Sequence, residues 1–367
     1  MIKTILTYQP LFFALALVFT FVRRCGLGAL ARAAWTAALF LCAVKFVAFE
    51  LVGGSAFAPE LPEVLIWIWN WAYSGMCLLL LFSILLFFLP PRVRLYALPV
   101  IAWTMSAVGV WNGIRVPDVR EVELSFENLP ESLDGYRILH LTDVHASSAA
   151  TRWRTEAIVE RANAAGADLA VVTGDLVDGK PRGQAHNLEP LKDLSAKDGV
   201  LYCTGNHEYY HDWLGWKAQF DEWGMRFLDV EWVSPAPGLA VGGVRDTACT
   251  RYGIPPPRVV DTFNGATNGE FRVYLQHKPY LKDIEPLEDF DLQISGHTHG
   301  GVAPVMGWIV ARHNKGWLRG VYELGRGRKI FVSRGAGQWA GFPIRFFDDS
   351  EIVVLVLRRR PDGSPAD

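Results

Sequence analysis

The spacing of apolar and polar residues divides the chain into two parts. Residues 1–113 contain long apolar runs with few charges, and four runs approach or exceed the roughly 20 residues that a helix needs to cross a bilayer. These runs lie near residues 4–22, 33–52, 64–89 and 95–112. Residues 114–360 mix apolar and charged positions, as water-soluble domains do, and a short tail follows at residues 361–367. We predict about four transmembrane helices followed by one globular domain.

Within residues 114–360, strand-like and helical periods alternate. A first strand is expected near 118–126, and five apolar runs are typical of buried strands: 136–142, 168–173, 200–204, 271–276 and 290–295. Helical spacing at 151–165 and 188–194 separates the first three runs. This order predicts βαβ units with a largely parallel sheet. Residues 320–358 alternate and carry Gly and Pro turns, so they predict antiparallel hairpins at the edge of the same fold.

Basic residues in the short loops predict how the apolar helices cross a membrane. The loops after the first and third runs hold five arginines: Arg23, Arg24, Arg32, Arg92 and Arg94. The loop at 53–63 has no basic residue. Because basic loops stay on the cytoplasmic side, we expect the globular domain on the outer, periplasmic face of a bacterial inner membrane.

A few polar and aromatic residues stand out in the apolar part. Trp67, Trp69 and Trp71 begin the third run and are typical of the membrane–water interface. Lys45 and Glu50 lie in the second run, where an ionisable group is costly and often functional. Glu50 is near the end of the run, and Lys45 can also snorkel or pair with a neighbouring helix, so a structural role remains an alternative.

Charge and cysteine usage exclude some classes of function. The net charge is −2, and the only basic cluster is Arg358–Arg360, so nucleic acid is not expected as a partner. The five cysteines form no CxxC pair and no zinc-finger spacing. A disulfide between Cys203 and Cys249 stays open as an alternative in an oxidising compartment.

Residue types that bind metals follow each of the five buried strands. In chain order they are Asp143 with His145, Asp175, Asn206, His277, and His297 with His299. In an open α/β sheet, ligands collect at the carboxyl ends of the strands. Convergence at that edge would supply enough oxygen and imidazole donors for two metal ions.

Each of these residues has a simpler explanation when it is taken alone. Asp143 could cap a helix, Asp175 after Gly174 could form a turn, and His277 could be an ordinary surface histidine. His297 and His299 are harder to dismiss, because two histidines that flank one residue face the same side of an extended chain. Five such coincidences at consecutive strand ends are improbable, and we therefore predict a metal site.

The ordered motifs resemble those of the calcineurin-like metallophosphoesterases. The matching blocks are Asp143-x-His145, Gly174-Asp175-x-x-Asp178, Gly205-Asn206-His207-Glu208, His277 and Gly296-His297-x-His299. The resemblance continues through Ser333-Arg334-Gly335 and Pro343-Ile344-Arg345 to the apolar strand at Ile352. With its apolar N-terminal part, the chain is similar to the bacterial membrane-anchored branch, which resembles enzymes that cut the pyrophosphate of UDP-diacylglucosamine. The implied fold is an α/β four-layer sandwich, in which two packed β-sheets are flanked by helices.

The resemblance implies two metal ions that share one carboxylate. Asp143, His145, Asp175 and His299 would hold one ion, and Asp175, Asn206, His277 and His297 would hold the other. Such donors suit Mn²⁺, with Fe²⁺, Zn²⁺ and Mg²⁺ as alternatives. Two ions can activate a bridging hydroxide and clamp the phosphoryl oxygens. The ligating histidines must be neutral, so activity is expected to fall below about pH 6.

Four further residues are candidates for the reaction. By resemblance, His207 would act beside the leaving oxygen as an acid or a charge stabiliser, and Asp178 would orient it. The alternative for His207 is a backbone hydrogen bond at a helix start. Arg334 and Arg345 are candidate phosphate partners, although surface salt bridges explain them equally well. The chain departs from the branch at Val302, where members often carry Gln, and a polar contact near the site is then missing.

Two classes of function fit these observations. The first is a membrane-anchored hydrolase that cleaves a phosphodiester, phosphomonoester or pyrophosphate bond, with an amphiphilic or lipid-linked substrate favoured by the apolar runs. The second is a transmembrane sensor or transport module whose domain only binds a phosphorylated ligand. The complete ligand set favours the enzyme. Aromatic residues after the last ligand, Trp308, Trp317, Trp339 and Phe342, are expected either in the core, which we favour, or at a membrane-facing lip.

Overall fold

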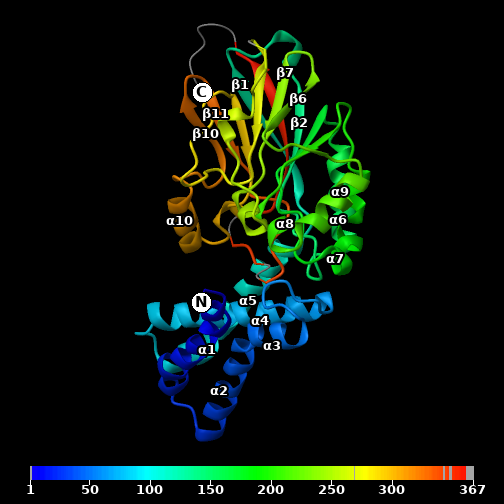
Figure 1. Cartoon of the computed structure of the whole chain (residues 1–367). Helices are drawn as coiled ribbons and strands as arrows, with labels where there is room; N and C mark the ends of the chain where they lie inside the picture. The colour runs from blue at the N-terminus through cyan, green and yellow to red at the C-terminus, as the bar shows by residue number, and fades with distance from the viewer. Residues whose placement is uncertain (1, 268, 342–343, 347–348, 361–367) are drawn as a thin grey trace. The chain divides into compact units, whose positions relative to one another are not determined.

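The chain forms two compact units (Figure 1), seen in a computed structural model that describes residues 2–267, 269–341, 344–346 and 349–360. Unit 1 comprises residues 1–115, 147–149 and 339–346, and unit 2 comprises residues 116–146, 150–338 and 347–367. Phe342, Pro343 and the predicted tail at 361–367 lie outside the described residues. The two short additions to unit 1 come from the part of the sequence that carries the predicted metal ligands.

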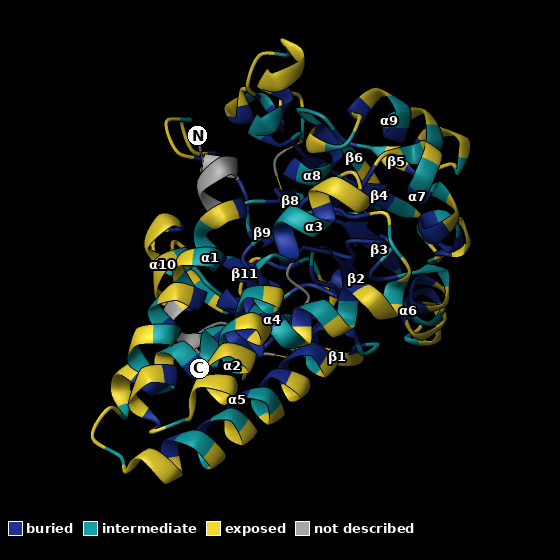
Figure 2. Cartoon of the chain, turned by 90° about the horizontal axis from the view of Figure 1, so that it is seen from below, coloured by how far each residue is buried: buried dark blue, intermediate teal, exposed yellow. Residues whose placement is uncertain are grey.

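Unit 1 is helical. Its helices are α1 (Ile2–Thr20), α2 (Ala29–Ala43), α3 (Lys45–Val52), α4 (Glu63–Leu85) and α5 (Pro91–Ile114). Helices α4 and α5 pack against each other, and the indole of Trp103 lies directly on Gly75, where an added Cβ would be 2.6 Å from it. Both helices keep many apolar residues exposed (Figure 2), as expected of helices that face lipid.

The expectation of about four membrane spans is only partly met. Among the described residues, α4 and α5 are long and apolar enough to cross a membrane. The predicted run at 33–52 is a pair, α2 and α3, bent by 51°, which adds a third span if the pair crosses as one. Helix α1 covers the first run but is not among these candidates. The bend lies at Val44, immediately before Lys45.

Unit 2 contains two six-stranded sheets. The first sheet runs in the order β1 (Asp118–Phe126), β12 (Glu351–Arg359), β2 (Arg137–Leu141), β3 (Leu169–Val172), β4 (Val200–Tyr202) and β5 (Arg226–Phe227). The second runs in the order β10 (Gly320–Gly325), β11 (Arg328–Val332), β9 (Leu292–Ser295), β8 (Phe271–Leu275), β7 (Leu239–Gly243) and β6 (Glu231–Ala236). Both sheets mix parallel and antiparallel pairs.

Successive side chains along a strand point to opposite faces of its sheet and so contribute to two different hydrophobic cores. Leu169 and Val171 of β3 join Val273 and Leu275 of β8 in the core between the sheets. Their neighbours Ala170 and Val172 point the other way, into a core with α6 (Arg152–Ala164) and α9 (Trp213–Glu222). Helix α7 (Pro181–Leu188) lies on the same side as α6 and α9, whereas α10 (Pro304–His313) lies on the opposite side (Figure 1). Two sheets flanked by helices agree with the implied sandwich.

Several predicted elements need correction. The helix expected at 188–194 is instead α7 at 181–188, continued by a 3₁₀ turn at Glu189–Asp193. Pro181 stands at the start of α7, and Pro190 has no N–H to continue an α-helix. The hairpin of β10 and β11 confirms part of the prediction for 320–358, but residues 351–359 form β12. Its buried apolar run lies between β1 and β2 in the first sheet, parallel to β1, as suits a central strand.

Candidate metal centre

The predicted ligands follow strands of both sheets. Asp143 and His145 follow β2, Asp175 follows β3, and Asn206 begins α8 (Asn206–Tyr210) after β4. His277 follows β8, and His297 and His299 follow β9. Each ligand therefore stands at the carboxyl end of its strand, as the sequence predicted. The side chains from the two sheets meet: Asp143 and His145 lie beside His299, and Asp175 lies beside His277.

The backbone at the ligands is unusual. Five ligands adopt a positive φ between 49° and 71°, the left-handed region that glycine favours: Asp143, His145, Asp175, His297 and His299. For a residue with a Cβ this conformation is strained. Such strain persists where surrounding hydrogen bonds fix the chain, and it concentrates at functional sites. Here Asp143 N–H donates to Gly174 O at 3.0 Å, and His145 N–H donates to Asp175 O at 3.1 Å.

One group of ligand atoms surrounds a first position. Atoms of Asp143, His145 and His299 all lie within 4.8 Å of one another. The two imidazole Nε2 atoms are 3.2 Å apart, and Nε2 of His299 lies 3.3 Å from Oδ1 of Asp143. The outer nitrogen of His299 faces Gly337 O at 3.2 Å. A backbone carbonyl behind the ring fixes which nitrogen points to the metal position.

A second group lies around Asp175. Atoms of Asp175, His277 and His297 lie within 4.8 Å of one another. Nε2 of His277 is 3.1 Å from Oδ2 of Asp175, and its Nδ1 lies 2.7 Å from Thr173 O. Asn206 is buried, and its Oδ1 has no hydrogen-bond partner in the described part of the chain. A buried carbonyl oxygen without a donor is costly, and a hard cation would satisfy it.

Asp178 lies behind two imidazoles. Its Oδ1 is 3.1 Å from Nδ1 of His145 and 2.5 Å from Nδ1 of His207. One carboxylate oxygen thus orients a predicted metal ligand and the predicted acid together. The Nε2 of His207 lies 3.9 Å from Oδ2 of Asp175, so this ring borders the Asp175 group. The catalytic roles that the resemblance implied for Asp178 and His207 stay predictions.

Buried charges move the histidine pKa values in opposite directions. Burial lowers the pKa of His277, but Asp175 and Asp143 outweigh this effect and raise it to about 10. Asp175 and Asp178 likewise overcome burial at His207 and raise its pKa to about 9. For His297, burial and the charge of His277 lower the pKa well below its ordinary value. The carboxylates thus favour positive charge beside them, either as protons on these rings or as bound cations.

Glycines let the ligand turns approach each other. A Cβ added at Gly205 would lie 2.1 Å from Oδ1 of Asp175, and one added at Gly337 would lie 2.0 Å from Val144 O. Gly335, with φ +79°, would place a Cβ 2.6 Å from that of Asp143. Any side chain at these three positions would displace a ligand turn.

The sequence did not assign roles to Glu208 and His211, and the structure locates both beside the site. The carboxylate of Glu208 accepts hydrogen bonds from the backbone N–H groups of Asp175, Leu176 and Gly205, at 2.7–3.1 Å. His211 Nε2 lies 3.9 Å from Oδ1 of Asp178. The signal for Glu208 was its place three residues after Gly205, the spacing of a capping box.

The other residues singled out from the sequence are two arginines, Val302 and two cysteines. Arg334 is half-buried beside Gly335, and its N–H donates to Oε1 of Glu351 at 2.9 Å. Arg345 is completely buried and belongs to unit 1, where its N–H donates to Gly109 O at 2.8 Å. Their roles in substrate binding stay predictions. Val302, where members of the membrane-anchored branch often have Gln, is buried. Cys203 and Cys249 are free thiols.

Comparisons with known proteins agree with this geometry. The sequence signature described as calcineurin-like phosphoesterase matches residues 136–301. An uncharacterized metallophosphoesterase of Aquifex aeolicus is 30% identical over 247 residues, which cover 65% of this chain and 91% of the relative. The chain belongs to the calcineurin-like metallophosphoesterase family.

Other relatives extend beyond the matched region. An uncharacterized metallophosphoesterase of Campylobacter jejuni is 31% identical over 254 residues, which cover 67% of this chain and 65% of the relative. A transmembrane protein with a metallophosphoesterase domain of Danio rerio is 29% identical over 272 residues, which cover 71% of this chain and 62% of the relative. The match thus spans just under two thirds of these two relatives. Metallophosphoesterases of this family use two divalent ions, and the two ligand groups around Asp143 and Asp175 suit such a pair.

Proposed function

We propose that this metallophosphoesterase is anchored in the bacterial inner membrane and cleaves a phosphodiester, phosphomonoester or pyrophosphate bond in an amphiphilic, lipid-linked substrate. The observation that carries the reaction class is the pair of ligand groups around Asp143 and Asp175, with His207 beside them. The apolar helices α4 and α5 support the anchor, as does the relative from Danio rerio whose name calls it a transmembrane protein.

The residues divide into holders of metal and a proton donor. Asp143, His145 and His299 would hold one ion, Asn206, His277 and His297 the other, and Asp175 would bind both. Two bound ions supply an activated water and offset the charge of the phosphoryl group; we favour Mn²⁺. In the metal-free protein Asp175 and Asp178 raise the pKa of His207 to about 9, so both of its ring nitrogens carry a proton through neutral pH. With Nδ1 held by Asp178, Nε2 is free to protonate the leaving oxygen.

A first experiment tests the reaction class. The full chain is purified in detergent and assayed with an aryl phosphodiester and Mn²⁺. Asp175→Asn and His207→Ala should each lower kcat at least about 100-fold, the range of lost acid–base or charge stabilisation. Asp221→Asn and His186→Ala alter exposed residues of the same types on α9 and α7 and serve as controls. Full activity in Asp175→Asn would contradict the mechanism. Metal content near zero would favour a sensor instead.

A second experiment tests the orientation. We propose that unit 2 lies on the periplasmic face, because the arginines concentrate in the loops after the first and third apolar runs. A reporter enzyme that is active only in the periplasm, fused after Asp367, should be active. A reporter that is active only in the cytoplasm should stay silent at the same position. The reverse pattern would place the domain in the cytoplasm.

A further inference from the structure

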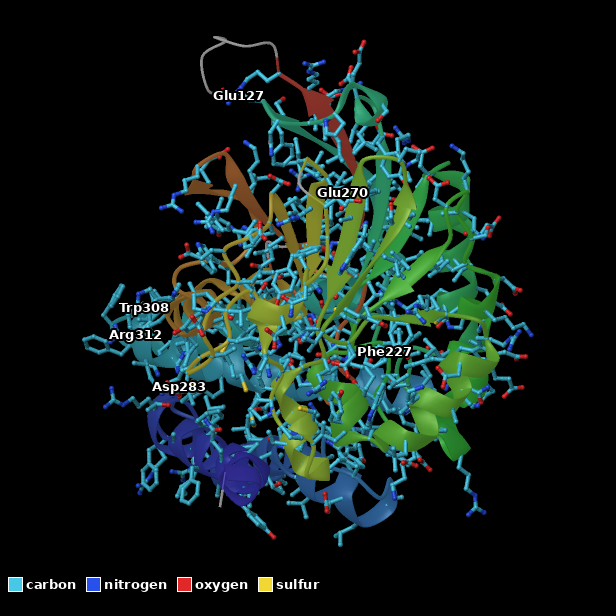
Figure 3. The ribbon with its side chains drawn as sticks, turned by 45° about the horizontal axis from the view of Figure 1, so that its top comes forward. Glu127, Phe227, Glu270, Asp283, Trp308 and Arg312 are labelled. Carbon is cyan, nitrogen blue, oxygen red and sulfur yellow. The ribbon has the colours of Figure 1, made fainter. Side chains whose placement is uncertain are left out.

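Helix α10 presents large apolar side chains to the outside of unit 2. Met306 is 48% exposed, Trp308 is 68% exposed and Ile309 is 41% exposed. The sequence favoured a core position for Trp308, and the structure shows the opposite. Figure 3 shows Trp308 and Arg312 on the same outer side of the fold. A concentration of exposed Trp, Met and Ile on one short helix marks an interaction surface.

Basic residues border these apolar side chains. Arg312 lies one helical turn after Trp308, His313 ends the helix, and Lys315 follows it; all three are exposed. We call Met306, Trp308, Ile309 and Arg312 the α10 surface. Trp at the headgroup level, apolar side chains and an adjacent Arg are the composition of a helix that lies in a lipid interface. Arg also pairs with the phosphates of lipid headgroups.

Helix α10 packs against the segment that carries two predicted metal ligands. A Cβ added at Gly301 would lie 2.4 Å from Cα of Gly307, so the turn after His299 packs directly against α10. Gly307 N–H donates to Ala303 O at 2.7 Å. After the helix, Leu318 O accepts from Thr298 Oγ1 at 2.6 Å. The helix and the loop that follows it therefore both contact the segment that carries His297 and His299.

We propose that α10 is an interfacial helix, in which Met306, Trp308 and Ile309 enter the lipid surface and Arg312 binds a headgroup phosphate. This inference rests on the proposed function. It assigns lipid as the occupant, because the same chain carries apolar helices that favour a membrane and because the surface combines apolar and basic side chains. Through its tight packing on the turn after His299, the helix presents lipid-linked phosphates to the metal ligands, whereas small soluble esters reach them without it.

The first test compares activity on a soluble substrate with activity on a substrate in the bilayer. Wild type and Trp308→Ser are reconstituted in vesicles with anionic lipid and assayed with a soluble aryl phosphodiester and with a long-chain phosphodiester in the bilayer. Because the variant loses the apolar side chain that enters the lipid, kcat/KM for the bilayer substrate should fall about tenfold or more. The soluble substrate should change less than about twofold. Trp153→Ser on α6, where the indole is 45% exposed, is the matched control. Equal losses on both substrates would overturn the inference.

The second test measures contact between the α10 surface and lipid and does not depend on enzyme activity. Trp308→Cys and Trp153→Cys are labelled with an environment-sensitive dye in vesicles that contain lipids with a shallow nitroxide quencher, and the unsubstituted chain gives the background. The label at position 308 should be quenched and the label at 153 should not. No quenching at 308, or quenching replaced by energy transfer between two labelled copies, would overturn the lipid assignment. If wild type cleaves neither substrate, the proposed function fails, while the quenching still decides the surface.

Discussion

At the scale of single residues, the metal centre depends on backbone conformations that residues with a Cβ seldom adopt. Each left-handed residue costs of the order of 1–2 kcal/mol relative to its usual conformation. Five predicted ligands share this conformation, and their turns are held by hydrogen bonds and by the close approach of Gly205 and Gly335. The left-handed backbone conformation directs the ligand side chains toward the two proposed metal positions. We expect that the same residues in relaxed turns would not meet there. Metal binding would offset part of this cost.

The sequence identified which residues meet, because metal-binding types after buried strands are conspicuous. It did not reveal how they are oriented. The dependence of His299 on Gly337 O and of His277 on Thr173 O involves backbone atoms, which have no residue signature. The shared oxygen of Asp178 also became visible only in three dimensions.

Replacement of Asp178 tests the orientation of two imidazoles at once. Asp178→Asn keeps the size of the side chain but removes the charge that faces Nδ1 of His145 and His207. We expect kcat and the apparent metal affinity each to fall about 10- to 100-fold, as is typical when a hydrogen-bond partner of a metal ligand is lost. Metal titration and steady-state kinetics on the purified chain measure both. Asp221→Asn is the control, and an unchanged metal affinity would mean that Asp178 serves His207 alone.

The pKa of His207 makes a prediction for the metal-free protein. Burial alone would lower this pKa, but the carboxylates of Asp175 and Asp178 raise it to about 9. Because it exceeds the ordinary value near 6.5, the charged ring stabilises the fold below about pH 6.5, and this contribution is lost as the pH rises through about 9. Bound cations should lower the pKa, since they oppose the imidazolium charge.

NMR titration of histidines labelled at Cε1 measures this directly, with His207→Gln to assign the signal. In the metal-free protein the signal should titrate near pH 9, and it should shift to lower pH when Mg²⁺ or Zn²⁺ is added. Thermal unfolding should show the loss of stability between neutral pH and pH 10, and this loss should be smaller in His207→Gln. A midpoint near 6.5 without metal would contradict the assigned environment.

At the scale of elements, the five strand ends were predictable and their arrangement was not. Apolar runs identify buried strands, but βαβ spacing does not tell which strands share a sheet. The division into two sheets followed only from the family resemblance. The position of β12 depends on pairing with β1 more than 200 residues earlier, for example between Ile352 and Val119, and no local pattern records such a pairing.

The short helix α8 connects β4 to the second ligand group through Glu208. Glu208→Gln should destabilise the chain by about 2–3 kcal/mol, because its carboxylate accepts three backbone N–H groups and an amide offers only one oxygen. Since two of the donors belong to Asp175 and Gly205, metal content should fall as well. Thermal and denaturant unfolding in detergent, with metal analysis, measure these effects. Glu222→Gln on the exposed side of α9 is the control, and equal stability of both variants would contradict this role.

At the scale of the whole molecule, composition predicted four apolar runs, whereas the described residues give two candidate spans, or three with the bent pair of α2 and α3. A run of apolar residues does not show where a helix bends, and the bend of 51° between α2 and α3 divides the predicted second span. Composition also could not show that residues 147–149 and 339–346, distant in sequence, belong to the helical unit. The hydrogen bonds from Lys45 to Asn70 and to Gly341 O explain why this buried lysine is tolerated beside the bend.

Lys45 supports the interior of unit 1, and its removal should unfold that unit more easily. The side chain is fully buried, and Nζ donates to Oδ1 of Asn70 at 2.5 Å and to Gly341 O at 2.6 Å, with the ring of Phe46 at 4.3 Å. In Lys45→Met both acceptors lose this donor, and each buried acceptor left unsatisfied costs about 1–3 kcal/mol. The melting temperature of the full chain in detergent should therefore fall.

Replacing Asn70 by Leu in the Lys45→Met chain should recover part of the lost stability, because one of the two unsatisfied acceptors is then gone. If Lys45→Met and the double variant melt like wild type, the lysine has no structural role in unit 1, and a functional role at membrane depth becomes the better explanation.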